Sequence, residues 1–327
     1  MPLTVLITRK IPERGMLILE KNGFECIVHK ADRPMTRQEL ESGIKNADAI
    51  IPMLNNRIDA SLIDLAPKLK IVANLAAGTD NIDIPACSAR GVAVTNTPGV
   101  LTEATADLTF ALLLSAARHV VKADRYLREG RYNGWDPLLF TGPSLNGKIL
   151  GIIGMGRIGQ AVAQRGLGFG MKIIYHNRNP LPDKITAPLG AAYLPLEEVI
   201  READFLSLHL PYSPAVHHLI NKERLEMMKP EAYLINTARG AHVDEKSLVA
   251  HLKAKKIAGA ALDVYELEPL LAPGLADLDN VTLLPHLGSA TYDARSAMAQ
   301  MSAESVSAVL TGKKPRNLLN PEVFQSA

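Results

Sequence analysis

A glycine-rich turn limits what this chain can fold into more than any other feature of its sequence. The turn reads Gly154-Met155-Gly156-Arg157-Ile158-Gly159. It follows the apolar run 148–153, which is typical of a buried parallel strand, and it precedes 160–165, which favours a helix. A strand, a glycine turn and a helix place backbone N–H groups and a helix N-terminus where a pyrophosphate binds. We therefore predict a dinucleotide site; the alternative is a glycine-rich loop without a ligand.

Each glycine of the turn has a separate expected role. Gly154 permits the tight turn, Gly156 lets the phosphates approach the backbone, and Gly159 lets the helix lie close to the strand. Met155, Arg157 and Ile158 lie between them and are expected to contact the cofactor with the glycines.

The segment after the next strand indicates which cofactor is used. The expected strand 171–175 is followed by His176-Asn177-Arg178-Asn179. Roughly 20 residues past the glycines, an NAD-binding protein normally places an acid on the ribose 2′-hydroxyl, but here the first acid is Asp183. The guanidinium of Arg178 suits a 2′-phosphate. We predict that NADP(H) is preferred and NAD(H) possible; alternatively, Arg178 is a solvated loop charge.

The remainder of this region alternates strand and helix. Such alternation predicts an α/β fold with a doubly wound parallel sheet, the Rossmann type. Arg239, Glu268 and His286 each follow an expected strand, and ligands of such sheets bind beyond the carboxyl ends of the strands. We therefore expect all three to face the cofactor crevice. The expected strands are 205–210, 233–236, 257–264 and 281–284, and helical patterns include 223–228 and 245–252.

The first hundred residues alternate in the same way but contain no GxGxxG. We expect a smaller flavodoxin-like domain there, followed by one long helix over 102–129. The helical run 290–311 should pack back onto this first domain. The prediction is a discontinuous substrate domain (1–100 and 288–327) and a dinucleotide-binding domain (101–287), and 327 residues suffice for two domains. The expected elements are strands 4–8, 24–28, 48–51, 70–75 and 91–96 and helix 13–22.

Composition argues against several other classes of protein. With 36 basic and 34 acidic residues the chain is nearly neutral, and no basic run is long enough for nucleic acid. Cys26 and Cys87 suggest neither a disulfide framework nor a metal site. The apolar run after Met1 is too short for a signal peptide, and nothing approaches transmembrane length. We expect a cytoplasmic globular protein that binds neither nucleic acid nor membrane.

Arg239, Glu268 and His286 are a cation, a carboxylate and an imidazole, which together suffice to move a hydride on and off a 2-hydroxy acid. Arg239 can hold the carboxylate and polarise the carbonyl of a 2-keto acid. His286 can donate the proton that makes the hydroxyl, and Glu268 can orient its ring. Singly, each has a structural alternative: an ion pair, a surface acid before a proline, and a loop histidine.

These residues lie within longer motifs that resemble the D-isomer-specific 2-hydroxyacid dehydrogenase family, and within it most the glyoxylate/hydroxypyruvate reductases. The similarity covers essentially the whole chain. It implies a two-domain enzyme with its active site in the cleft, D-specific reduction of small 2-keto acids such as glyoxylate and hydroxypyruvate, and a homodimer formed through the nucleotide domains. The motifs are 77–83, 95–99, 102–107, 145–148, 209–211, 236–240, 262–269 and 285–291.

The resemblance also implies binding residues beyond the glycine turn. For the substrate it implies the loop Ala76, Ala77, Gly78 and Thr79, whose backbone amides can meet a carboxylate, and Leu54, which could equally belong to the core. For the cofactor it implies Thr102, Asn177, Arg178, Asn179, His209, Leu210, Pro211, Thr237, Ala238, Arg239, Asp263, His286 and Gly288. No metal is expected.

Several related activities are less consistent with the sequence. Ala77 stands where a phosphonate-oxidising member has Lys, Glu268 where formate dehydrogenases have Gln, and the chain ends at Ala327 without the extra domain of many phosphoglycerate dehydrogenases. A dinucleotide-sensing corepressor would keep the same three residue types, but polar tails of the kind that bind partners are lacking. Trp135, in a loop, is expected at a dimer contact.

Overall fold

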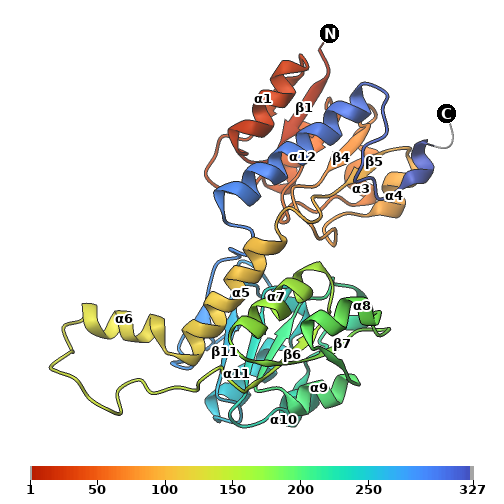
Figure 1. Ribbon diagram of the computed structural model, residues 1–327. Helices are drawn as coiled ribbons and strands as arrows, with labels where there is room; N and C mark the ends of the chain where they lie inside the picture. Colours follow the sequence, from red (N-terminus) through yellow and green to blue (C-terminus); the bar gives the residue numbers. More distant parts are fainter. Residues whose placement is uncertain (1, 325–327) are drawn as a thin grey trace. The chain divides into compact units, whose positions relative to one another are not determined.

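A computed structural model describes residues 2–324, which form two compact units (Figure 1). Unit 1 comprises the chain up to Leu101 and again from Ser289, and unit 2 spans Thr102–Gly288. The N-terminal and C-terminal parts of the chain therefore share one unit, joined by α12 (Tyr292–Leu310), which packs against α1 (Glu13–Lys21).

The sheet of unit 1 consists of five parallel strands in the order β2-β1-β3-β4-β5. Neighbouring strands are in register, with Leu6 beside Ile50 and Val72 beside Val94. This is the flavodoxin order 2-1-3-4-5, in which the direction of winding reverses between the first and third strands. The strands are β1 (Thr4–Ile7), β2 (Glu25–Val28), β3 (Ala49–Ile51), β4 (Ile71–Ala73) and β5 (Ala93–Thr95).

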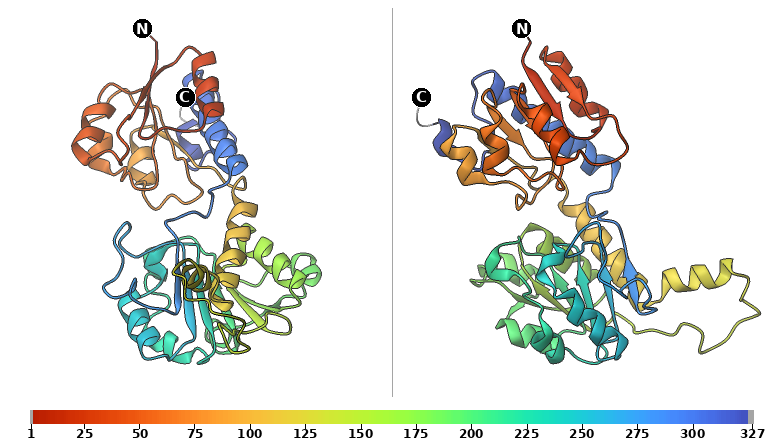
Figure 2. Two further views of the ribbon diagram at one scale, coloured as in Figure 1. Left: turned by 90° about the vertical axis from the view of Figure 1, so that its left-hand side faces the viewer. Right: turned by 180° about the vertical axis from the view of Figure 1, so that it is seen from behind.

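Strand alternation divides the core of unit 1 between the two faces of its sheet. Leu6, Ile50, Val72 and Val94 point to one face, where they pack on α2 (Arg37–Ile44), α3 (Ala60–Asp64) and α4 (Ile84–Ala89). The other face is covered by α1 and α12, which lie side by side in both views of Figure 2. Gly15 makes this close approach possible, because a Cβ there would lie 2.9 Å from the Ala299 carbonyl oxygen. The last described element of the unit is the short 3-10 helix Pro321–Phe324.

The sheet of unit 2 has seven parallel strands in the order β12-β11-β10-β9-β6-β7-β8. Counted from β6, the first six follow the Rossmann order 3-2-1-4-5-6, and β12 extends the far edge. The predicted α/β class with a doubly wound sheet is thus confirmed. The strands are β6 (Ile149–Ile153), β7 (Lys172–His176), β8 (Ala192–Tyr193), β9 (Phe205–Leu208), β10 (Tyr233–Asn236), β11 (Gly259–Leu262) and β12 (Val281–Leu283).

Helices cover both faces of the unit 2 sheet (Figure 1). One apolar cluster joins α5 (Thr102–Ala117) and α7 (Arg157–Gly168) to the sheet through Phe110, Val162 and Ile152. The other joins α9 (Leu196–Glu202), α10 (Lys222–Met227) and α11 (Glu245–Lys253) to it through Leu208 and Leu234. The remaining helical segments are α8 (Asp183–Thr186) and the 3-10 turns Ala187–Leu189, Pro214–Val216 and Gly240–His242.

The expectation of one continuous helix over 102–129 is wrong. The segment forms α5 and α6 (Val120–Arg128), which are bent by 62° relative to each other. His119 interrupts the helix because its φ of 54° is left-handed, a conformation that an α-helix cannot continue through. Within the described residues no single helix is long and apolar enough to span a membrane, although the bent pair α5–α6 passes that test on length and composition.

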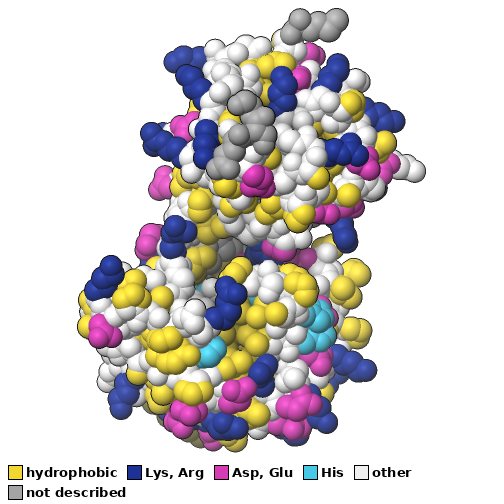
Figure 3. All heavy atoms as spheres, turned by 90° about the vertical axis from the view of Figure 1, so that its right-hand side faces the viewer, with side chains coloured by type: hydrophobic (Ala, Val, Ile, Leu, Met, Phe, Trp, Pro, Cys, Tyr) yellow, Lys and Arg dark blue, Asp and Glu magenta, His cyan; other side chains and the backbone are white. Residues whose placement is uncertain are grey.

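Charges of both signs are mixed on the face of the molecule that Figure 3 shows. Figure 3 shows one face on which Lys and Arg side chains alternate with Asp and Glu side chains, and no extended area of a single sign is seen on that face. This mixture agrees with the near-neutral composition of 36 basic and 34 acidic residues. On that face there is no continuous basic stripe of the kind typical of nucleic-acid-binding surfaces.

Candidate active site

The glycine turn lies where β6 and β9 adjoin, which is the point of unit 2 where the strand order reverses. Gly154 has a φ of 97°, and a Cβ there would lie 2.6 Å from the backbone carbon of His209. Gly159 packs equally closely, with the Gly154 carbonyl oxygen 2.3 Å from the position of a Cβ. Only glycine fits at these two positions, so the turn following β6 is held against the segment following β9.

The start of α7 has the properties of an anion site. Gly156 is its N-cap and supplies no side-chain hydrogen bond, and a Cβ at this position would meet nothing within 4 Å. The N–H groups of Gly156, Arg157 and Ile158 have no acceptor among residues 2–324. Open backbone donors at the positive end of a 12-residue helix suit a pyrophosphate. The residues of the turn therefore fit a dinucleotide.

Met155 differs from its neighbours in the turn. Its side chain is buried, and its N–H donates to Asn177 Oδ1 at 2.7 Å. This hydrogen bond fixes the glycine turn to the segment at the end of β7.

The guanidinium of Arg178 is available to a ligand. Arg178 and Asn179 are exposed, and Arg178 makes no hydrogen bond or ion pair with any residue that the structure describes. Asp183 begins α8, further along the chain. No carboxylate therefore neutralises Arg178 within the described part of unit 2.

The segment after β9 forms the other wall of this region. The His209 ring lies 2.8 Å from Ser207 Oγ through Nε2, and burial lowers the pKa of His209 to about 3, so the ring is neutral at physiological pH. The Leu210 carbonyl lies 3.1 Å from the Nε2 atom of His242, and Pro211 is exposed. His209 is therefore excluded as a source of positive charge.

Glu268 and His286 are directly hydrogen-bonded, with His286 Nδ1 and Glu268 Oε2 2.9 Å apart. The other carboxylate oxygen accepts the Tyr265 N–H at 3.0 Å. Burial alone would raise the pKa of Glu268, but the hydrogen bond and positive charge of His286, with smaller contributions from the Tyr265 N–H and the charge of Arg239, lower it below its ordinary value. Glu268 is ionised at neutral pH, and Nε2 of His286 remains available for proton transfer.

The loop that carries His286 is held by Asp263, at the end of β11. The Asp263 carboxylate accepts the N–H groups of Leu287 at 2.6 Å and Gly288 at 2.7 Å. The N–H of His286 donates to the Asp263 carbonyl at 2.9 Å. These bonds hold His286 at a φ of 56°, a strained conformation for a residue with a side chain. Sequence reasoning treated Asp263 as a cofactor contact only and missed this positioning role.

Arg239 follows β10 in an extended conformation, with φ of −146° and ψ of 140°. Asn236 fixes this segment: its Nδ2 donates to the Arg239 carbonyl at 2.8 Å, and its Oδ1 accepts the Ala238 N–H at 3.0 Å. The charge of Arg239 contributes to the lowered pKa of Glu268, which places the two near each other. The structure thus brings all three predicted catalytic residues to one edge of the unit 2 sheet.

Two threonines predicted as cofactor contacts lie on this side of unit 2. Thr102 is the first residue of α5 and is partly buried. The Thr237 hydroxyl lies 3.0 Å from that of Thr109, and both are buried. This hydroxyl pair joins the loop after β10 to α5, so Thr237 has a structural partner.

In unit 1, the loop 76–79 after β4 exposes unpaired backbone donors. Its carbonyl groups are used internally: those of Ala76, Ala77 and Gly78 accept from Thr97 N–H and from the amides of Asn96 and Asn74. Within the described residues, the N–H groups of 76–79 have no acceptor. Successive unpaired N–H groups can bind an anion. Leu54, after β3, is half-buried in a turn.

Comparison with known proteins identifies close relatives of this chain. Residues 110–288 match the family described as "D-isomer specific 2-hydroxyacid dehydrogenase, NAD binding domain". A glyoxylate reductase from Thermococcus litoralis is 47% identical, with 99% of this chain and 98% of the relative covered. The glyoxylate reductase of Pyrococcus furiosus is 49% identical, with 98% and 96% covered.

Solved structures similar to this one cover nearly the whole chain. A protein from Thermus thermophilus has a TM-score of 0.91 and 46% identity, covering 97% of this chain and 100% of that one. An NADPH-dependent glyoxylate/hydroxypyruvate reductase from Sinorhizobium meliloti, in complex with NADP and malonate, has a TM-score of 0.86 and 34% identity, covering 99% and 98%.

The contact between Gly240 and Tyr265 provides a test of how the site is held. A Cβ at Gly240 would lie 1.8 Å from the Tyr265 carbonyl carbon, so Gly240→Ala must displace backbone that leads to Arg239 and Glu268. We expect a loss of about 1–3 kcal/mol or more in the free energy of unfolding, measured in urea, because overpacking forces such shifts. Gly168→Ala is the control: a Cβ there meets nothing within 4 Å, and a helical alanine should stabilise by roughly 0.5–1 kcal/mol. Equal stability of the Gly240 variant and the wild type would contradict this contact.

Proposed function

Because the chain belongs to the D-isomer specific 2-hydroxyacid dehydrogenase family, we propose that it reduces glyoxylate and hydroxypyruvate to D-2-hydroxy acids and prefers NADPH as hydride donor. The observation that carries this proposal is the hydrogen-bonded pair of His286 and Glu268 beside Arg239, at the end of the sheet that bears the glycine turn. A proton donor, an orienting carboxylate and a cation are the groups that reduction of a 2-keto acid requires.

Binding and orientation of the substrate depend on positive charge and backbone donors. Arg239 holds the carboxylate of the keto acid and polarises the carbonyl; such positioning contributes a large part of the rate. Within unit 1, the unpaired N–H groups of loop 76–79 suit a carboxylate, and we assign Ala76, Ala77, Gly78 and Leu54 to substrate binding.

Proton transfer is the task of His286. Its Nδ1 is bound to Glu268, so its Nε2 donates the proton to the carbonyl oxygen, and in the reverse direction accepts it. The hydrogen bond from Nδ1 to the Glu268 carboxylate fixes the orientation of the ring. The hydride itself is supplied by the reduced nicotinamide when the cofactor is bound. We assign the pyrophosphate to Gly154, Gly156, Arg157, Ile158 and Gly159.

Steady-state kinetics with His286→Gln test this function. Wild type should oxidise NADPH in the presence of glyoxylate, and the variant should lose about 10²–10⁴ in kcat, the usual contribution of a positioned general acid. The cofactor dissociation constant should change far less, since His286 acts on the substrate. His29→Gln, a partly buried histidine of unit 1, is the control and should retain activity. Absence of turnover with any 2-keto acid in wild type that binds NADPH would refute the proposal.

The preference for NADPH rests on Arg178, which is exposed and unpaired within the described residues. A charge-assisted hydrogen bond contributes about 1.5–3 kcal/mol, so NADPH should be used about ten- to a hundredfold better than NADH. In Arg178→Ala, the kcat/KM for NADPH should fall to about that for NADH. The kcat/KM for NADH should persist, because the turn 154–159 is unchanged. Arg201→Ala, an exposed arginine on α9, should preserve the ratio. A preference that survives Arg178→Ala would mean that Arg178 only faces solvent.

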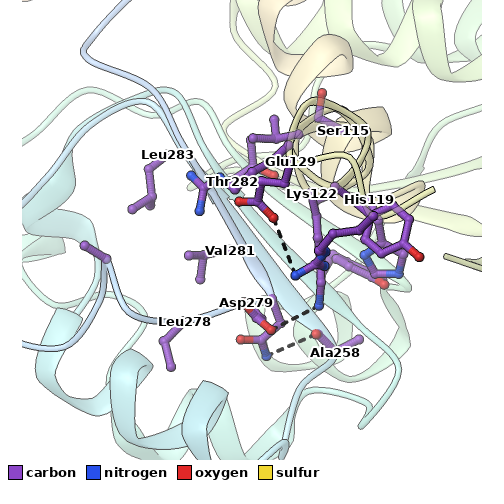
Figure 4. Close-up of a pocket in the computed structure, with 18 residues that line it drawn as sticks. Ser115, His119, Lys122, Glu129, Ala258, Leu278, Asp279, Val281, Thr282 and Leu283 are labelled. Carbon is purple, nitrogen blue, oxygen red and sulfur yellow. Dashed lines mark hydrogen bonds and ion pairs between the residues drawn. The ribbon is translucent and has the colours of Figure 1, made fainter. Parts of the chain in front are cut away.

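We also propose a homodimer in which a second copy covers α6 and the loop after it. Within unit 2, a pocket of about 360 Å³ lies between α6, the end of α5 and residues 276–283 (Figure 4). Lys122 and Asp279 bridge it at 3.1 Å, joined by a dashed line in Figure 4. Around it, apolar side chains are exposed on α6, and Trp135 and Leu138 are 82% and 79% exposed. Large apolar side chains exposed in one stretch of the chain favour a contact with another protein.

Sedimentation equilibrium tests the dimer. Wild type should have twice the 35.4 kDa mass of the chain. A Trp135→Ser/Leu138→Ser double variant should shift toward the monomer, because it removes apolar area from the contact. Tyr292→Ser, at a residue 98% exposed at the start of α12, should leave the mass unchanged. A monomeric wild type would refute this part of the proposal.

A further inference from the structure

Three side chains with no part in the proposed reaction come together at one place in unit 2. His218 Nε2 lies 2.6 Å from Glu266 Oε1. The His217 and His218 rings are stacked, with centroids 4.0 Å apart and planes inclined by 21°. One ligand atom from each of His217, His218 and Glu266 lies within 4.8 Å of the other two. The residues come from two segments separated by 48 positions in sequence.

The backbone holds both segments in place. His218 has a left-handed φ of 48°, and its N–H donates to the Ala241 carbonyl at 2.9 Å. Ile220 continues the contact as a parallel bridge to Val243. A residue with a side chain in this conformation is strained by about 1–3 kcal/mol and persists only where its surroundings impose it. The position of His218 is therefore determined by tertiary contacts and does not depend on its bond to Glu266 alone.

Glu266 is held from the other side by a buried acid. Its N–H donates to Glu245 Oε1 at 2.8 Å, and Glu245 is only 3% exposed. Glu268 is two residues away from Glu266, and Asp244 adjoins Glu245. This excess of acidic groups favours a bound cation.

The nitrogen and oxygen donors of these three side chains suit a divalent ion of intermediate softness. Two imidazoles and one carboxylate are a known zinc ligand set, with bonds of about 2.0–2.2 Å and a fourth position open to water. We propose that His217, His218 and Glu266 bind Zn²⁺. Ligand atoms around a tetrahedral ion with such bonds lie about 3.3 Å apart. The His218–Glu266 contact would therefore widen, and the His217 ring would turn toward it from its stacked position.

His217 is the residue that distinguishes a metal site from a simple ion pair. The His218–Glu266 bond is a complete hydrogen bond without any ion. His217 is exposed, and its Nδ1 has only a long contact of 3.4 Å with the Tyr212 hydroxyl. Its ring can therefore rotate and bring Nε2 to an ion without losing a strong interaction. The ion pair alone predicts no contribution of His217 to metal binding.

Zn²⁺ titration of the full-length protein tests the proposal after removal of metals with a chelator. Calorimetry should show one Zn²⁺ per chain. His217→Ala and Glu266→Gln should each weaken binding by at least about tenfold, since even supporting residues of metal sites contribute 10- to 100-fold. The control is His119→Asn, which removes an imidazole elsewhere in unit 2 and suits the left-handed backbone there. The affinity of His119→Asn for Zn²⁺ should equal that of the wild type.

Thermal unfolding gives an independent measurement, because a ligand that binds only the native state raises Tm. Zn²⁺ should raise the Tm of wild type and of His119→Asn, but not that of His217→Ala. His217 is exposed, so this variant remains folded even if Glu266→Gln does not. Binding that is unchanged in His217→Ala, or no stoichiometric binding in wild type, would overturn the proposal. These readouts do not involve turnover, so they are separate from the test of the reductase activity.

Discussion

The candidate active site depends on one interaction: the Asp263 carboxylate accepts hydrogen bonds from two backbone N–H groups. That carboxylate binds Leu287 and Gly288, and the carbonyl of Asp263 binds the N–H of His286. Together they hold His286 in a left-handed conformation from which Nδ1 reaches Glu268. Burial raises the pKa of Asp263 despite these bonds and the charge of His286. A buried carboxylate is costly, and here the cost is offset by two backbone donors that an apolar side chain would leave unpaired.

The parallel sheet of unit 2 then collects residues that are far apart in sequence. The glycine turn after β6 touches the segment after β9 because these strands are neighbours at the point where the strand order reverses. Arg239 follows β10, and Glu268 and His286 follow β11 and β12. Since all strands run in one direction, their carboxyl ends share an edge. The glycine turn and the three proposed catalytic residues therefore occupy the same edge of one sheet.

Hydrophobic patterns in the sequence predicted most helices and strands, but they did not predict strand β8 or the break between α5 and α6. Apolar runs located β6, β7, β9 and β10 within two residues of their ends, because buried parallel strands are continuously apolar. The two-residue strand β8 was missed because both of its residues are exposed. The break at His119 was also missed: histidine carries no signal comparable to glycine or proline, and the left-handed φ there is imposed by the fold.

By itself, the sequence determined the α/β class, the dinucleotide turn and the identity of Arg239, Glu268 and His286 as chemically competent groups, because these depend on local periodicity and residue type. Only the tertiary structure decided which atoms are free to act. It directs Nδ1 of His286 to Glu268, leaves the amides of 76–79 unpaired in the described chain, and brings His217 and His218 to Glu266. The contact of His286 with Glu268 joins residues 18 positions apart, and that of His218 with Glu266 joins residues 48 positions apart. Spacing within one strand or helix carries no information about them, since they arise from strand order and from backbone conformations that packing imposes.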